Sequence, residues 1–121
     1  MLIYQKGGFP FAAAKFLPET MQSFEENILS NLPNKYENVN SLIRDIAVVH
    51  GELLLIHPFR EGNGRTARIL ANLMVRKQGF GALHFDKVGE REFKLYVDAV
   101  QDSASKKYIK MEKFIKSIFP S

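Results

Sequence analysis

Two strongly apolar stretches with helical spacing stand on either side of one short loop and form the centre of the fold. The first, with Ser41 or Asn40 as its N-cap, has the i, i+3, i+4, i+7 spacing of one helix face and contains Leu42, Ile43, Ile46, Val49, Leu53, Leu54 and Ile56. The second starts at Asn63 or Gly64, ends at Lys77 and has the apolar side Ala67, Ile69, Leu70, Leu73 and Met74. Because the residue before a proline avoids the helical region, Pro58 ends the first helix. The sequence therefore predicts two central helices joined by a loop at residues 57–64.

The remaining patterns are mostly helical. Pro18, Glu19 and Thr20 are typical of a helix start, and this helix should run to about Ser30. A further helix begins at Gly89 and Glu90 and carries Phe93, Tyr96, Val97 and Val100. A last helix holds Tyr108, Ile109, Phe114, Ile115 and Ile118. Residues 2–16 contain two short apolar runs around Gly7-Gly8 and predict a small β-hairpin, although Pro10 weakens one side of its ladder.

Length and composition limit the class of protein. With 121 residues and 45% hydrophobic side chains, the chain suits one globular domain, residues 1–121. It has no cysteine, which excludes disulfides, thiolate zinc sites and cysteine nucleophiles and fits a reducing compartment. No apolar run approaches the roughly 20 residues that span a bilayer, and the N-terminus lacks a signal-peptide pattern. We therefore expect a cytoplasmic protein with no membrane partner.

Charge is unevenly distributed along the chain. Residues 1–59 have four basic and six acidic side chains, whereas residues 60–121 have thirteen basic and seven acidic ones. The basic half would suit a phosphate-bearing ligand, but from charge alone a solvated helical surface is the better interpretation. Nucleic acid is not expected as a partner, because no motif combines basic and aromatic residues.

The loop between the central helices carries the chemistry. A helix N-terminus offers unpaired N–H groups and partial positive charge to a phosphate, and glycines before it allow close approach. Arg65 and Arg68 are about one turn apart and can face the same anion. Glu61 is an oxygen ligand suited to Mg²⁺ that bridges phosphates, and His57 can accept a proton near neutral pH. Together these residues indicate activation of a hydroxyl against a nucleotide phosphate.

The segment His57-Pro58-Phe59-Arg60-Glu61-Gly62-Asn63-Gly64-Arg65-Thr66-Ala67-Arg68 resembles the Fic-family signature, HPFx(D/E)GNGRxxR, at every fixed position. The resemblance implies a mainly α, Fic-like helical core at residues 18–121, preceded by a small N-terminal β-hairpin flap at residues 1–17. It also implies transfer of AMP from Mg·ATP to a Tyr, Thr or Ser hydroxyl of a target protein docked at the flap. In the family pattern the roles are as follows: His57 is the catalytic base, Glu61 binds Mg²⁺, Gly62, Asn63 and Gly64 form the anion hole, and Arg65 and Arg68 hold the outer phosphates of ATP.

Alternatives stay open within this resemblance. A lysine at position 64 would match the Doc-like branch, which transfers phosphate; Gly64 favours nucleotidyl transfer instead. The motif does not separate AMP from UMP or another phosphate-containing group, and a catalytically silent nucleotide-binding regulator is a rival interpretation. Outside the motif, His50 and His84 are expected to be structural, and no histidine spacing indicates a transition-metal site.

Two departures from the family pattern concern the ends of the domain and its control. Many family members have helices before the flap, so the chain is either a minimal form or part of a longer protein. The inhibitory pattern (S/T)xxxE(G/N) is not matched, because Gln22 and Pro33 stand four residues before Glu26 and Glu37. Any inhibitory helix would then come from a separate antitoxin-like protein in trans, or from a longer parent chain.

Overall fold

The computed structural model describes residues 5–6, 9–10, 17–56 and 63–120. The helices in this part are α1 (Leu17–Asn27), α2 (Val39–Leu55), α3 (Asn63–Lys77), α4 (Glu90–Ser103) and α5 (Ile109–Ser117), with 3₁₀ turns η2 (Leu29–Asn31) and η3 (Phe85–Lys87). Strands β1 (Gln5–Lys6) and β2 (Phe9–Pro10) pair antiparallel, with Gln5 opposite Pro10 and Lys6 opposite Phe9. The expectation of a mainly α fold is confirmed, whereas the use of the N-terminal segment as a flap stays a prediction.

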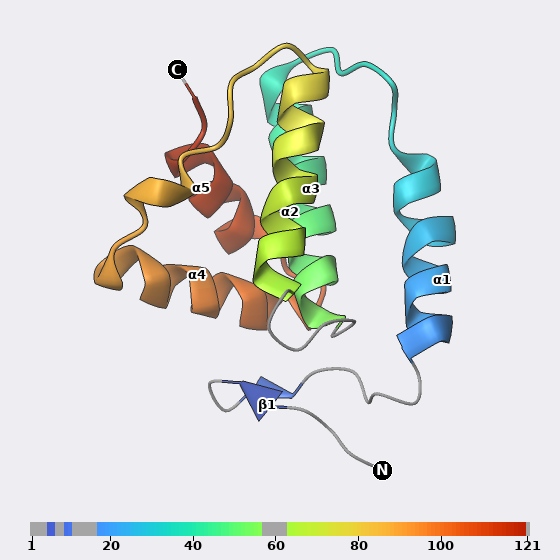
Figure 1. Cartoon of the computed structure of the whole chain (residues 1–121), viewed down its shortest axis with the longest axis vertical. Helices are drawn as coiled ribbons and strands as arrows, with labels where there is room; N and C mark the ends of the chain where they lie inside the picture. The colour runs from blue at the N-terminus through green and yellow to red at the C-terminus, as the bar shows by residue number, and fades with distance from the viewer. Residues whose placement is uncertain (1–4, 7–8, 11–16, 57–62, 121) are drawn as a thin grey trace.

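Helix α2 is the centre of the molecule. In Figure 1 it runs antiparallel beside α3, and it also packs against α4 and α5. Helix α1 stands on the far side of the central pair from α4 and α5 (Figure 1). The core lies where these helices meet, and its fully buried side chains include Leu42, Ile46, Val49, Val75, Met111 and Ile115. This arrangement places the C-terminal end of α2 and the N-terminal end of α3 at the same edge of the molecule.

The ends of α2 differ from the sequence expectation. Neither Ser41 nor Asn40 is the N-cap: the extended residue Asn38 caps the helix, and its side chain accepts from the Ser41 backbone N–H at 2.8 Å. An N-cap side chain accepts from a backbone N–H two or three residues later in the chain. Asn38 stands three residues before the Ser41 N–H, whereas Asn40 and Ser41 already lie inside the first turn. Helix α2 ends at Leu55, and Ile56, two residues before Pro58, is extended with ψ 134°.

The buried face of α3 also differs. Ala67, Ala71 and Val75 face the core with 0%, 1% and 0% exposure, whereas Ile69 and Leu73 are 55% and 57% exposed. The prediction that Ile69 and Leu73 belong to the buried side is therefore wrong. Small side chains at 67 and 71 let α3 approach α2 closely, and this close packing decides the orientation over the larger apolar residues.

The two ends of α3 match their sequence signals. The helix begins at Asn63 and ends at Lys77, as expected. Gly79 follows with φ +88°, a value that favours glycine. The Gly79 N–H donates to the Arg76 carbonyl and the Phe80 N–H to the Val75 carbonyl, the paired bonds of a Schellman C-cap.

Helices α4 and α5 bury fewer of the expected residues. Tyr96, Phe114 and Ile115 are buried, but Phe93 and Ile109 are 54% and 68% exposed. Helix α1 also stops at Asn27, before the expected Ser30, and the chain continues into η2. No helix of the described segments is both long and apolar enough to cross a membrane.

Candidate functional site

The start of α3 is the part of the predicted site that the structure describes. Asn63 is the first residue of the helix, and Gly64 and Arg65 follow in its first turn. That turn contains no acidic side chain, so no residue of the helix itself neutralises the partial positive charge of its N-terminus. The first N–H groups of a helix have no partner within it, which leaves this end suited to an anion.

The two motif arginines lie in different surroundings. Arg65 is exposed, whereas Arg68 is half-buried. The Arg68 guanidinium folds back along the helix toward its start, and its Nη1 lies 3.2 Å from the position that a Cβ on residue 64 would occupy. Among the described residues no carboxylate forms an ion pair with either arginine. Arg68 is thus a partly desolvated cation held at the N-terminal end of α3.

A buried polar pair contacts α3 at Ala67, the residue before Arg68. His50 of α2 is 1% exposed, and its Nδ1 lies 3.1 Å from the Ala67 carbonyl of α3. Its Nε2 lies 2.5 Å from the hydroxyl of Tyr96, which comes from α4. Burial lowers the pKa of His50 to about 4, and the nearby Arg68 charge adds to the lowering. His50 therefore links three helices as a neutral ring, in agreement with the expectation that it is structural.

Sequence reasoning did not single out Tyr96. In the sequence it is one apolar-stripe residue of α4, and its distance of 46 residues from His50 gives no sign that the two meet. Burial raises the pKa of the Tyr96 hydroxyl, while the Arg68 charge opposes that rise. Both members of the pair are thus within electrostatic reach of a motif arginine.

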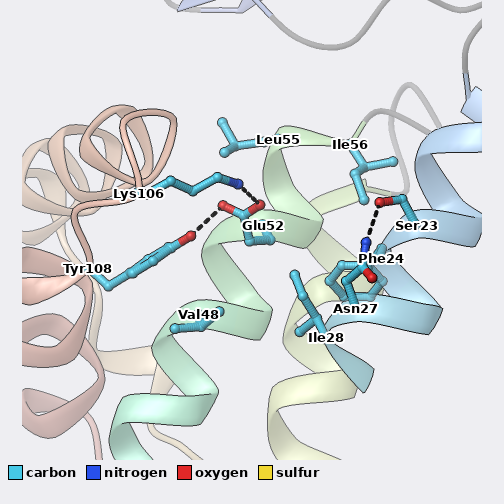
Figure 2. A pocket seen from close by; sticks show the side chains of 10 residues that line it. All are labelled: Ser23, Phe24, Asn27, Ile28, Val48, Glu52, Leu55, Ile56, Lys106 and Tyr108. Carbon is cyan, nitrogen blue, oxygen red and sulfur yellow. Dashed lines mark hydrogen bonds and ion pairs between the residues drawn. The ribbon is translucent and has the colours of Figure 1, made fainter. Parts of the chain in front are cut away.

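A hollow of about 700 Å³ lies between α1, α2 and the segment that joins α4 to α5 (Figure 2). Its lining is largely apolar and includes Ile56, next to the motif. At one side Glu52 accepts from the Tyr108 hydroxyl at 2.8 Å and pairs with the Lys106 ammonium at 2.5 Å. Among the residues that line the hollow, the only carboxylate is therefore already satisfied, and these bonds fasten α2 to the chain before α5.

Three of the predicted site residues, His57, Glu61 and Gly62, lie outside the described residues. Their roles as base, magnesium ligand and part of the anion hole stay predictions, as do the roles of Asn63, Gly64, Arg65 and Arg68. In the described ranges no group of three or more His, Asp or Glu side chains could hold a metal ion. The structure brings Gly64 and Arg68 together at the start of α3.

Comparison with known proteins identifies the class to which this fold and motif belong. The family model described as Fic/DOC family matches residues 3–75, more than half of the chain. The chain belongs to the Fic/DOC family.

Curated relatives are similar in sequence to part of this chain. The "Protein adenylyltransferase fic-1" of Caenorhabditis elegans is 35% identical over 82 residues, covering 55% of this chain and 16% of that protein. The "Protein adenylyltransferase Fic" of Nematostella vectensis is 38% identical over 68 residues, covering 56% of this chain and 15% of that protein. The matches thus span about a sixth of the length of these relatives.

Solved structures support the fold over the whole chain. The BepC protein of Bartonella tribocorum, a VirB-translocated effector with bound AMPPNP, has a TM-score of 0.73 at 20% identity and covers 100% of this chain and 58% of that one. The N-terminal Fic domain of a Bartonella quintana cell filamentation protein, with bound ADP, has a TM-score of 0.72 at 21% identity, covering 100% of this chain and 56% of that one. At this identity the likeness concerns the fold, which is a Fic-like helical fold.

Proposed function

We propose that the protein is an adenylyltransferase that transfers AMP from Mg·ATP to a Tyr, Thr or Ser hydroxyl of a target protein. The observation that carries the proposal is the position of Arg68, a half-buried guanidinium folded onto Gly64 at the open N-terminus of α3. The names of the relatives, and the AMPPNP and ADP bound to the structural neighbours, agree with a nucleotide-dependent transfer of this kind.

The proposed reaction is an in-line displacement at the α-phosphorus of ATP. The target hydroxyl oxygen forms a bond to that phosphorus, the bond from it to the oxygen that bridges to the β-phosphorus breaks, and pyrophosphate leaves. His57 accepts the proton of the hydroxyl as the new bond forms. The backbone N–H groups at Gly62, Asn63 and Gly64 hold the phosphates, and positioned donors of this kind stabilise the charge that develops in the transition state.

Arg65 and Arg68 would hold the outer phosphates. Arginine suits this task because its planar fork donates two parallel hydrogen bonds to a phosphate and stays charged at any working pH. Their different burial predicts different contributions: the half-buried Arg68 acts in a less polar setting than the exposed Arg65. Arg68 should therefore contribute more to ATP affinity.

Glu61 is the residue that would hold Mg²⁺. A single carboxylate fits this ion, which keeps several water molecules and takes further oxygen ligands from the substrate phosphates. When bound, the ion would neutralise charge on the phosphates.

The target would dock at the N-terminal hairpin. An exposed strand edge can add an extended segment through main-chain hydrogen bonds, with little demand on its sequence. Replacing Gln5 and Lys6 of β1 by proline should impair labelling of the target and spare ATP binding, because proline removes the donors. Unimpaired labelling by the folded variant would remove the hairpin from target binding, leaving it as a cover for the core.

Control would come from outside these 121 residues, through an antitoxin-like protein in trans or a further segment of a longer parent chain. The 121-residue chain alone should then label itself with Mg·ATP. Replacing remote acids one at a time, including Glu26, Glu37 and Glu112, should not raise this activity. A large activation by any of these changes would reveal an inhibitory glutamate within the chain.

The direct test supplies the protein with Mg²⁺, a cell lysate and ATP labelled at either the α- or the γ-phosphate. AMP transfer predicts protein labelling from the α-label, with no γ-labelling above that of the lysate without the protein. Additional γ-labelling would indicate phosphate transfer. In a parallel reaction, labelling from α-labelled UTP but not from ATP would indicate UMP transfer. ATP binding without labelling, by a chain that retains His57, would identify a silent nucleotide-binding regulator instead.

A further inference from the structure

The Tyr96 and His50 pair is a buried polar contact that the proposed mechanism does not use. Tyr96 is 9% and His50 1% exposed, and both are enclosed by aromatic rings. The His50 ring centroid lies 5.6 Å from that of Phe85, and the Tyr96 centroid lies 4.5 Å from that of Phe114. Burying polar groups among aromatic rings costs free energy unless all of their hydrogen bonds are made. The orientation of the two side chains is therefore closely constrained.

The direction of the two hydrogen bonds follows from their partners. A carbonyl oxygen only accepts, so the proton of the neutral His50 ring is on Nδ1 and is donated to Ala67 at 3.1 Å. The unprotonated Nε2 then accepts from the Tyr96 hydroxyl at 2.5 Å. The Ala67 carbonyl thereby fixes the ring tautomer, and the Tyr96 hydroxyl holds the ring in the orientation that donates to this carbonyl.

Ala67 is the residue directly before Arg68. The hydrogen bond from His50 to the Ala67 carbonyl holds α3 against α2 at the point from which the Arg68 side chain reaches back to Gly64. The Arg68 charge acts on both members of the pair: it adds to the lowering of the pKa of His50 and opposes the rise in the pKa of Tyr96. A neutral imidazole at this place neither repels the guanidinium nor competes with an anion for it.

We infer that Tyr96 is a positioning residue, which acts through His50 and the Ala67 carbonyl to hold Arg68 in place for the outer phosphates of the nucleotide. The inference rests on the proposed function, in which Arg68 contacts those phosphates. It adds a residue of α4, outside the motif and beyond the 3–75 match of the family model, to the nucleotide site.

The test compares ATP with AMP, because only ATP has outer phosphates. Tyr96→Phe removes one hydroxyl and keeps the buried ring. The variant should bind ATP about 3- to 10-fold more weakly, the value of one hydrogen bond, and should bind AMP as the parent does. His50→Leu, which removes both hydrogen bonds, should lower the preference for ATP over AMP by at least as much.

Tyr108→Phe is the matched control. It also removes a hydroxyl that donates to a largely buried partner, Glu52 at 2.8 Å, but at a different place on α2. A general loss of stability would affect both variants alike, so the control should keep the parental ratio of ATP to AMP affinity.

The outcomes separate the two hypotheses. If the parent prefers ATP and Tyr96→Phe keeps that preference, the positioning role is wrong and the proposed function stands. If the parent binds neither nucleotide, or binds both equally, the phosphate role of Arg68 fails and the positioning role fails with it. A lowered preference in Tyr96→Phe with an unchanged one in Tyr108→Phe supports the inference.

Discussion

The guanidinium of Arg68 lies over Gly64, with Nη1 3.2 Å from where a Cβ at residue 64 would be. The lack of a side chain at one motif position is thus what allows a second motif residue, four positions later, to fold back to the helix start. This spatial relationship gives Gly64 a structural role besides the proposed one, which is to let a phosphate approach the backbone closely.

Gly64→Ala should separate stability from nucleotide binding. The new methyl group meets only the end of a flexible side chain, so Arg68 can move aside, and alanine favours a helix over glycine by up to about 1 kcal/mol. We expect an unchanged or higher melting temperature together with weaker ATP binding, measured by calorimetry. Gly81→Ala, whose Cβ would only touch Pro120 at 3.9 Å, is the control. Parental ATP affinity in Gly64→Ala would contradict the importance of this contact.

His57→Ala should abolish transfer and leave ATP affinity nearly unchanged. The proposed base acts on the target hydroxyl and not on the nucleotide, and loss of a general base typically costs about 10²- to 10⁴-fold in rate. The measurement is the rate of labelling from α-labelled ATP at saturating nucleotide. Transfer at the parental rate would exclude His57 as the base.

Glu61→Ala should raise the concentration of Mg²⁺ needed for transfer. Removing the carboxylate leaves the ion held by phosphate and water alone, so its apparent affinity should fall. A magnesium titration of the labelling rate measures this, with Glu90→Ala at the start of α4 as a control that should leave the titration unchanged. Identical curves for Glu61→Ala and the parent would show that Glu61 is not a magnesium ligand.

Gly51→Ala should destabilise the fold although alanine is the better helix former. A Cβ at residue 51 would lie 2.9 Å from Ser103 Cβ, at the crossing of α2 and α4, where the neighbour has no flexible end to move. Overpacking of this kind costs about 1–3 kcal/mol, seen as a lower urea midpoint. Ser103→Gly in the same chain should restore part of the loss. A urea midpoint of Gly51→Ala equal to or above that of the parent would mean that α2 and α4 can move apart without loss of stability.

Acid should weaken the fold through His50. Its folded pKa of about 4 lies below the ordinary value of 6.5, so between these values the unfolded chain binds more protons. The contribution of His50 to the free energy of unfolding should therefore be fully present above about pH 6.5. It should be lost as the pH falls toward 4, which lowers the free energy of unfolding by about 2–3 kcal/mol. Urea unfolding at several pH values measures the slope, and His50→Gln should flatten it. An equally steep slope in the variant would assign the acid sensitivity to other groups.

Local signals predicted much of this fold, and long-range packing explains what they missed. The limits of α3 follow from a glycine-rich start and a Lys77-Gly79 end, both readable from neighbouring residues. Which face of α3 is buried depends on the close approach of α2, and hydrophobicity alone wrongly favoured Ile69 and Leu73. The motif could be recognised from the sequence because its residues are adjacent in the chain.

The contact between His50 and Tyr96 could not be predicted in that way. It joins two helices that are far apart in sequence, and neither residue has a spacing that marks it. Only packing of α4 against α2 brings the hydroxyl to the ring. The cap at Asn38 was missed for a simpler reason, since two asparagines and a serine compete within residues 38–41.

Three consecutive residues of α2 each depend on the C-terminal part of the chain. His50 bonds to Tyr96, Gly51 makes room for Ser103, and Glu52 accepts from Tyr108. A chain cut in the loop between α3 and α4 would keep the whole motif on one fragment, yet that fragment would lack all three partners. Such halves should recover nucleotide binding only when mixed, which makes this loop a natural break point for a split reporter whose signal depends on reassembly.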